Sequence, residues 1–456
     1  MNVRTITYRS ITWLPTAFLL IALSIPSFAA DQGREVAETP AVIDLRERPA
    51  VENPIVKQRL AQLLPRLMEE ADIDLWLVLN REYAEDPVYF TLVPQPSFAA
   101  RRTTMLLFHR QADGSVQPIS INRYPLGDPF ETAWEGGQLD EQWKALGRKI
   151  AELDPRTIGV NTSREWPEAD GLTEGLHNRL LEVLPEGYSE RLVSAEDLVV
   201  RWFETRTEDE IGIYAHVVSL ARSVIAEGFS NEVITPGVTT TDDVAWFLRK
   251  RFAERNLDVW FMPYVNVQRP GAECNEDTDF CGTSGVIERG DVLHTDVGIC
   301  YLKLCTDTQE MGYVLKTGEH EVPEPLLEAL AEGNRWQDLF TAEFVTGRTG
   351  NEILEAAYDA IADEPWSSNI YTHPIGFVGH APGPTIGMWD KPGAIPGNGD
   401  WPLHSNTAYA IEGNIQLRYE PWDGQHLQIK LEQSAYFDGE QVIYLAGRQT
   451  DWHIVR

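Results

Sequence analysis

The sequence predicts an α+β protein built from two domains. The chain has 456 residues, of which 24% are charged and 43% hydrophobic, a balance typical of a globular protein of that size. Residues 54–203 alternate between helix-like and strand-like patterns. Residues 370–456 are rich in glycine, proline, tryptophan and short apolar runs, which favour curved antiparallel sheet. We therefore expect an α/β domain over residues 54–203, followed by a sheet-rich domain over residues 204–456.

The first 30 residues have the features of a secretory signal peptide. Two arginines precede an apolar run over residues 13–25, and the tripeptide Ser-Phe-Ala ending at Ala29 fits the small-x-small rule of signal peptidase. We expect cleavage after Ala29 or Ala30 and a polar linker over residues 31–53. The mature protein is then expected to be exported, periplasmic or extracellular, with no membrane span after signal removal.

The N-terminal domain is predicted from short apolar runs and two helical patterns. The predicted strands cover residues 75–79, 103–109 and 157–161, and the predicted helices cover residues 55–71 and 141–153. Pro65 lies inside the first helical pattern, where its missing N–H can interrupt the helix. This half of the sequence shows no catalytic constellation of its own.

The C-terminal domain opens with an apolar stripe at helical spacing between Ile211 and Ile225. Thr240 and Asp243 then fit a capping box at the start of a second helix. Strand-like text follows around residues 259–267 and 291–299, helices are expected over residues 322–345 and 350–362, and sheet is expected beyond residue 370.

The acidic balance of the chain restricts its partners. The formal net charge is -32 at pH 7, so bulk attraction to nucleic acid or to anionic membrane is excluded. An acid excess also keeps an exported protein soluble, which needs no specific partner.

The four cysteines occur as two close pairs. An oxidising compartment permits disulfides, and the natural pairing joins Cys274 to Cys281 and Cys300 to Cys305. Four cysteines allow three connectivities. A thiolate metal site is the rival interpretation. It is disfavoured because neither pair has the C-x-x-C spacing common in zinc sites.

Two aspartates, Asp296 and Asp307, lie eleven residues apart in an apolar stretch. An odd spacing would put them on opposite faces of one strand. A turn near Leu302 and Lys303 would instead make them neighbours on adjacent antiparallel strands, where two carboxylates repel unless a cation lies between them. A divalent metal ion would supply that cation if other hard ligands are present.

Further ligands of the required type follow in the sequence. His373 and His380 lie seven residues apart in THPIGFVGH, Glu412 lies in AYAIEGN, and Glu432 lies in IKLEQSAYF. A single histidine or glutamate on a strand is usually structural. Two aspartates, a histidine and two glutamates in this order, each on a strand-like segment, indicate a metal site much more strongly.

This ordered set resembles the pita-bread metallopeptidases, the family of methionine aminopeptidase, aminopeptidase P, prolidase and creatinase. The approach VIERGDVLHTDVG is also similar to the family's Q-x-G-D-x-x-x-x-D-x-G strand. The resemblance covers residues 206–456, and the first half is more weakly similar to the creatinase-type companion domain. It implies a creatinase-type N-terminal α/β domain followed by a pita-bread catalytic domain.

The resemblance also implies roles for the matched residues. Asp307 and Glu432 would bridge two divalent metal ions, manganese first, with zinc, cobalt or iron as alternatives. Asp296 would bind one ion, and His373 and Glu412 the other. In addition, Glu412 would accept a proton from water and His380 would donate to the developing oxyanion.

Several positions depart from the family pattern. The family usually has a histidine about seventeen residues before the first aspartate, and Asp279 lies there in this chain. Lys430 replaces an arginine, which keeps the charge but loses the planar fork. His294 alternates onto the face of Asp296 and is a candidate for contact with the ligands or substrate, as are Asp279 and Lys430. The remaining departures are Ala381 after His380, Gly413 after Glu412, and the text TQEM after Asp307 in place of I-T-R-T.

The predicted function is hydrolysis of the bond before proline by a metal-dependent Xaa-Pro peptidase, either an aminopeptidase or a dipeptidase. A peptide substrate is expected, and a homodimer is compatible with the sequence. Two alternatives remain open. One is hydrolysis of a non-proline amide on the same fold, and the other is a non-catalytic binding protein, which the absent upstream histidine favours.

Overall fold

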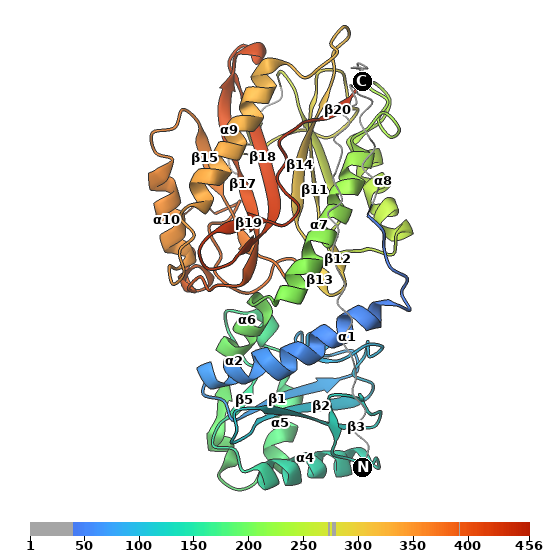
Figure 1. Cartoon of the computed structure of the whole chain (residues 1–456), viewed down its shortest axis with the longest axis vertical. Coiled ribbons are helices and arrows are strands. Elements are labelled where there is room, and N and C mark those ends of the chain that lie inside the picture. The colour runs from blue at the N-terminus through green and yellow to red at the C-terminus, as the bar shows by residue number, and fades with distance from the viewer. Residues whose placement is uncertain (1–39, 272–273, 276–279, 392) are drawn as a thin grey trace, which may run out of the picture. The chain divides into compact units, whose positions relative to one another are not determined.

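Two β-sheets organise the chain, one in each half of the sequence (Figure 1). The structure is a computed structural model that describes residues 40–271, 274–275, 280–391 and 393–456, without the side chains of residues 274, 275 and 280. No helix among these described residues has the length and hydropathy of a transmembrane segment. The predicted signal peptide lies outside the described residues.

The N-terminal sheet has six strands in the order β4-β3-β2-β1-β5-β6. Both faces of β1 are buried, with Trp76 and Val78 in one apolar cluster and Leu75 and Leu77 in another. A strand that is buried on both faces has a continuous apolar sequence, as LWLVL does. The strands are β1 (Leu75–Arg81), β2 (Thr103–Arg110), β3 (Val116–Asn122), β4 (Glu131–Thr132), β5 (Ile158–Val160) and β6 (Leu192–Ser194).

The helices of this half cover both faces of its sheet. Apolar residues of α2 (Leu64–Glu70) and α6 (Glu196–Glu204) pack in the cluster of Trp76. Those of α4 (Leu139–Leu153) and α5 (Glu174–Val183) pack in the cluster of Leu75. Helix α3 (Tyr89–Leu92) is a single short turn in this half.

The first helical segment differs from its prediction in two ways. Helix α1 (Arg48–Gln58) begins inside the predicted linker, because Pro49 in its first turn favours a helix start. A π-helical turn, Arg59–Leu63, joins α1 to α2. Pro65 in the first turn of α2 has no N–H for an i→i−4 bond, and the π turn keeps the path helical there.

The C-terminal sheet is larger and mostly antiparallel. Its main path is β15-β17-β18-β14-β11-β8, and β16, β19 and β20 pair with β17, β18 and β14 respectively. This confirms the predicted antiparallel sheet beyond residue 370. The strands are β8 (Tyr264–Gln268), β11 (Val292–Val297), β14 (Thr308–Val314), β15 (Ser367–Ile370), β16 (His373–Pro374), β17 (Thr407–Tyr419), β18 (Gln425–Phe437), β19 (Val442–Tyr444) and β20 (His453–Val455).

Two helix pairs pack on this sheet (Figure 1). Helices α7 (Glu208–Gly228) and α8 (Thr241–Glu254) pack near β8 and β14, whereas α9 (Glu324–Thr341) packs on β17 and β18 beside α10 (Gly350–Ala360). The predicted capping box is present, because Thr240 accepts a bond from the Asp243 N–H and the Asp243 side chain accepts from the Thr240 N–H. The predicted domain boundary at residues 203 and 204 lies at the end of α6 and stays a prediction.

Candidate metal centre

Four strands of the large sheet place three carboxylates and one glutamine in a single row. Asp296 on β11 lies directly opposite Gln309 on β14, and Gln309 lies opposite Glu432 on β18. Glu432 in turn lies opposite Glu412 on β17. Directly opposed residues on neighbouring strands project from the same face of a sheet. The register therefore brings together side chains that are far apart in the sequence.

Asp307 joins this row from the end of a tight hairpin. The hairpin consists of β12 (Ile299–Tyr301) and β13 (Leu304–Cys305). Its two turn residues, Leu302 and Lys303, have φ values of 52° and 63°, the left-handed backbone that two-residue hairpin turns require. The chain thus reverses between the two aspartates, where the spacing predicted a turn.

His373 on β16 faces the carboxylates with one ring nitrogen. Its Nδ1 lies 2.9 Å from the Pro374 carbonyl oxygen, to which an Nδ1–H donates. Nε2 then lies 3.5 Å from Asp307, 3.8 Å from Glu412 and 3.7 Å from Glu432. A histidine that donates from one nitrogen to a carbonyl presents the other as a metal ligand.

His380 lies beside His373, with the ring centroids 4.5 Å apart. Its other neighbour is the indole of Trp260, at 4.9 Å. Trp260 donates its indole N–H to the Thr306 carbonyl at 3.0 Å. A Cβ on Gly379 would approach the indole to 2.1 Å, so only glycine fits there. These contacts hold the Trp260 indole in place beside the His380 ring.

Burial controls the protonation of the four carboxyl groups. It raises the pKa of Asp307 and of Glu432 to about 7, and a neighbouring carboxylate adds to each shift. It raises the pKa of Asp296 and of Glu412 well above the ordinary range. Burial alone would lower the pKa of His373, but the nearby carboxylates of Asp307 and Glu432 raise it to about 10. If all four carboxyl groups were ionised, the single imidazolium of His373 would leave an excess of negative charge, and the raised pKa values reflect that cost.

Several of these ligand-type atoms are buried and have no hydrogen-bond partner among the described residues. They are Asp296 Oδ1, Asp307 Oδ1, both Glu432 carboxylate oxygens and His373 Nε2. Buried polar atoms normally have partners, and hard oxygen donors with one imidazole suit divalent metal ions. The residues present thus fit a metal centre. Three sets of ligand atoms each lie within 4.8 Å of one another: Asp296, Asp307 and Glu432; His373, Glu412 and Glu432; Asp307, His373 and His380.

Two of the cysteines, Cys300 and Cys305, lie in the hairpin that ends just before Asp307. Cys300 and Cys305 are opposed across the hairpin and form a disulfide, with their Cα atoms 4.0 Å apart. Cys305 also donates its backbone N–H to the Gly376 carbonyl at 2.7 Å, in the loop between the two histidines. Cys281 is disulfide-bonded as well, whereas the side chain of Cys274 lies outside what the structure describes.

Three further residues were predicted to contact the metal ligands or the substrate: His294, Lys430 and Asp279. His294 is buried, and its Nε2 lies 2.7 Å from Gln309 Oε1. Lys430 is also buried and donates to the Cys281 carbonyl at 2.6 Å, and burial lowers its pKa well below the usual range. Asp279 lies outside the described residues, so its predicted contact with substrate stays a prediction.

Two residues of the site were not among those predicted from the sequence. Gln309 lies in the carboxylate row and donates a short hydrogen bond to Glu412, and Trp260 packs against His380. The departure TQEM contains Gln309 and was the only available signal for it. No sequence signal indicated Trp260, because its role depends on contacts with His380 and Thr306, which are distant in the sequence.

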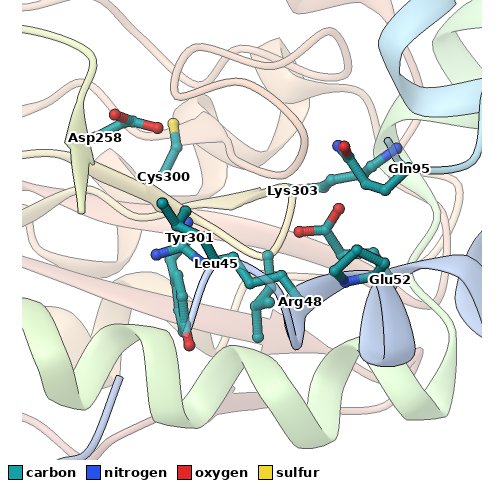
Figure 2. A pocket seen from close by; sticks show the side chains of 10 residues that line it. Leu45, Arg48, Glu52, Gln95, Asp258, Cys300, Tyr301 and Lys303 are labelled. Atoms are coloured by element: carbon teal, nitrogen blue, oxygen red, sulfur yellow. The ribbon is translucent and has the colours of Figure 1, made fainter. Parts of the chain in front are cut away.

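A cavity of about 300 Å³ lies elsewhere, between α1 and the β12–β13 turn (Figure 2). None of the five predicted metal ligands lines it. Lys303 projects from the turn and donates to the carbonyls of Phe90 and Val93 at 2.7 and 3.0 Å. Burial lowers the pKa of Lys303 to about 8. Lys303 thus anchors the hairpin to the N-terminal half of the chain.

Solved structures share this fold at low sequence identity. The X-Pro aminopeptidase from Thermotoga maritima aligns with a TM-score of 0.59 at 19% identity, covering 86% of this chain and 100% of that one. The Xaa-Pro dipeptidase from Bacillus anthracis aligns with a TM-score of 0.55 at 17% identity, covering 88% and 100%. A dipeptidase from Pyrococcus horikoshii aligns with a TM-score of 0.57 at 16% identity, covering 87% and 100%.

Sequence comparison identifies the family. A search of curated proteins gave no match. Residues 214–436 match the sequence model of metallopeptidase family M24, and all five predicted metal ligands lie within this range. Residues 214–436 therefore match metallopeptidase family M24, and the chain has the pita-bread fold.

Proposed function

We propose that this chain is an exported peptidase that uses two divalent metal ions to hydrolyse the bond before proline. The observation that carries the proposal is the buried cluster of four carboxyl groups and His373, whose ligand atoms include several that no described residue satisfies. Manganese is the first candidate, with zinc, cobalt or iron as alternatives. By family analogy, Asp296, Asp307, His373, Glu412 and Glu432 would hold the two ions.

The residues around the cluster supply the remaining chemistry. When bound, the ions would polarise the scissile carbonyl and lower the pKa of a water molecule. Burial and the charge of His373 lower the pKa of His380 to about 4. His380 is therefore neutral near pH 7 and can donate an N–H to the oxyanion that develops on the carbonyl. By family analogy, Glu412 would accept the proton from water.

Proline specificity is supported by the names of two matched structures, an X-Pro aminopeptidase and an Xaa-Pro dipeptidase. The proline ring fixes φ and its nitrogen carries no N–H, so a proline site needs an apolar surface more than a hydrogen-bond acceptor. Trp260, packed beside His380, offers such a surface. Dipeptides and longer peptides are both compatible with this arrangement.

Export is supported by the signal-like segment over residues 1–30 and by the disulfides, which persist in oxidising compartments. We propose a periplasmic or extracellular location. Mass spectrometry of the native protein should find a mature start at Ala30 or Asp31. An intact Met1 in a cytosolic fraction would contradict this proposal. The homodimer stays a prediction, for analytical ultracentrifugation to test.

Hydrolysis of a non-proline amide is the second candidate, because the departures from the family pattern remove no metal ligand and together indicate an altered substrate choice; Asp279 is one of them. Histidine and aspartate differ in charge and donor capacity, so the substrate amide would be held differently. If Asp279 faces the substrate, Asp279→His should raise activity on Xaa-Pro peptides. No gain in a variant that still binds metal would mean that this loop does not enter the site.

The deciding experiment is a substrate panel on mature protein reconstituted with manganese. It should contain Xaa-Pro dipeptides, longer Xaa-Pro peptides and matched peptides with alanine in place of proline. We expect cleavage of the proline peptides and none of the alanine ones. Cleavage of the alanine peptides alone would support the second candidate. No cleavage by a metal-loaded protein would support the non-catalytic alternative.

A further inference from the structure

Glu412 receives a hydrogen bond from a side chain that is itself held by another. Gln309 donates its Nε2–H to Glu412 Oε1. His294 Nε2 lies 2.7 Å from Gln309 Oε1. His294 is 2% exposed and Gln309 3% exposed, so bulk water does not compete for these bonds. The three side chains form a hydrogen-bonded relay that runs from His294 through Gln309 to Glu412, one of the predicted metal ligands.

The carboxylate fixes the direction of the whole relay. A carboxylate that binds metal is ionised and can only accept hydrogen bonds. If the Gln309 amide were turned over, its oxygen would lie against Glu412 Oε1, and two acceptors would face each other. The amide therefore presents its N–H to Glu412 and its oxygen to His294. That oxygen needs a donor, so the proton of His294 lies on Nε2.

The main chain leaves Gln309 and Glu412 little freedom to move apart. Gln309 lies directly opposite both Asp296 and Glu432 in the sheet. Thr372 holds the backbone of Glu412, because its hydroxyl accepts from the Glu412 N–H and donates to the Glu412 carbonyl, both at 2.9 Å. With its backbone fixed in this way, the Glu412 carboxylate takes its orientation from Gln309.

We propose that His294 and Gln309 are positioning residues, which orient the Glu412 carboxylate for binding of a divalent metal ion. This inference rests on the proposed metal centre and adds two residues to it. Residues that hydrogen-bond to metal ligands typically change metal affinity or activity by 10- to 100-fold when they are replaced. The relay should therefore be visible in metal binding itself, before any substrate is added.

The test is calorimetric titration of metal-free protein with Mn²⁺. Gln309→Met keeps the length of the side chain and removes both bonds, so we expect affinity to fall by roughly 10- to 100-fold. His294→Phe should weaken binding by about 10-fold, the lower end of that range. His294→Gln restores an N–H donor at the position of Nε2 and should bind metal nearly as well as wild type.

The matched control is Gln142→Met in the N-terminal sheet. Gln142 is also 3% exposed and makes two hydrogen bonds, to the carbonyls of Thr103 and Ile121 at 2.9 Å each. Its replacement should cost comparable stability and leave metal affinity unchanged. A shifted visible spectrum of bound Co²⁺ in Gln309→Met, absent from Gln142→Met, would show that the ligand geometry has changed.

The outcomes separate this inference from the proposed function. If wild type binds no metal, the metal centre itself is wrong, and the relay falls with it. If wild type binds metal and Gln309→Met binds it equally well, only the relay is overturned. Should Gln309→Met fail to fold, the histidine pair decides: weak binding by His294→Phe with recovery in His294→Gln supports the relay, and equal affinity in both contradicts it.

Discussion

Two buried aspartates, one in each half of the sequence, have very different surroundings. Asp86 in the N-terminal half is 1% exposed and Asp307 is 4% exposed, and burial raises the pKa of each to about 7. Asp86 accepts hydrogen bonds from the Val88 N–H at 3.1 Å and from Asn161 at 2.9 Å. Asp307 Oδ1 has no partner among the described residues. The same pKa thus accompanies a satisfied structural carboxylate and a ligand-type one.

Charge balance shows the same difference. Glu210 is buried against two arginines, with Arg59 at 2.7 Å and Arg206 at 3.3 Å. The guanidinium of Arg59 also lies over the rings of Trp202 and Phe377. The cluster in the large sheet has four carboxyl groups and one imidazole. Burial is common to both regions. A cation site is identified by carboxylate oxygens that have no hydrogen-bond donor and by too few cationic side chains to balance the carboxyl groups.

The largest effect on stability is expected at the satisfied cluster. Arg59→Met leaves Glu210 buried with one arginine, and breaking a buried pair in this way costs roughly 3 to 5 kcal/mol. Urea unfolding measures the loss. Added Mn²⁺ should stabilise wild type and variant by the same increment, because Arg59 is not part of the metal centre. If added Mn²⁺ restored the stability lost in Arg59→Met, the Arg59–Glu210 cluster and the metal centre would not be independent, which would contradict the account.

The pH dependence of stability should report Asp86 next. Its folded pKa of about 7 lies above the unfolded value of about 3.8. Between these values the folded state binds more protons than the unfolded state, so the contribution of Asp86 to stability falls as pH rises, by about 1.4 kcal/mol per unit. Asp86→Asn should remove this slope.

Unfolding of both proteins between pH 4 and pH 7 tests the prediction, because the carboxyl groups of the metal centre are common to both and cancel in the difference. Wild type should lose stability relative to Asp86→Asn as pH rises. A constant difference would mean that Asp86 is ionised throughout this range.

Within the metal centre, His380→Ala separates chemistry from binding. The variant should lose activity by roughly 10²-fold, the typical effect of removing one oxyanion donor. Its metal content should equal that of wild type, because all five predicted metal ligands remain. Turnover of the best panel substrate and metal analysis of the same sample measure both. Loss of metal would make His380 a ligand instead.

The smallest effect is expected from the hairpin disulfide. Cys300→Ser with Cys305→Ser should lower stability by about 2 kcal/mol, since the closed loop is short. Because the hairpin joins the two aspartate strands, metal affinity should fall slightly as well. Thiol titration of denatured, non-reduced wild type should find no free thiol, and four reactive thiols would exclude both disulfides.

The sequence predicted the parts of the fold and site that depend on local pattern. Apolar runs such as LWLVL identified buried strands, and the spacing of Asp296 and Asp307 predicted the turn between them. The early start of α1 was missed because residues 31–53 look polar and Pro49 gives only a weak start signal. Gln309 was missed for a different reason, since its place between Asp296 and Glu432 depends on the register of three strands that no local pattern encodes.

Metal stoichiometry tests the central claim most directly. Mature wild type, Asp307→Asn and Asp86→Asn should be stripped with a chelator, incubated with Mn²⁺, and analysed for bound metal by mass spectrometry. We predict two ions per chain in wild type and in Asp86→Asn, and a loss of bound metal in Asp307→Asn, because Asp307 would bridge both ions. Wild type without metal, or Asp307→Asn with as much metal as wild type, would contradict the account.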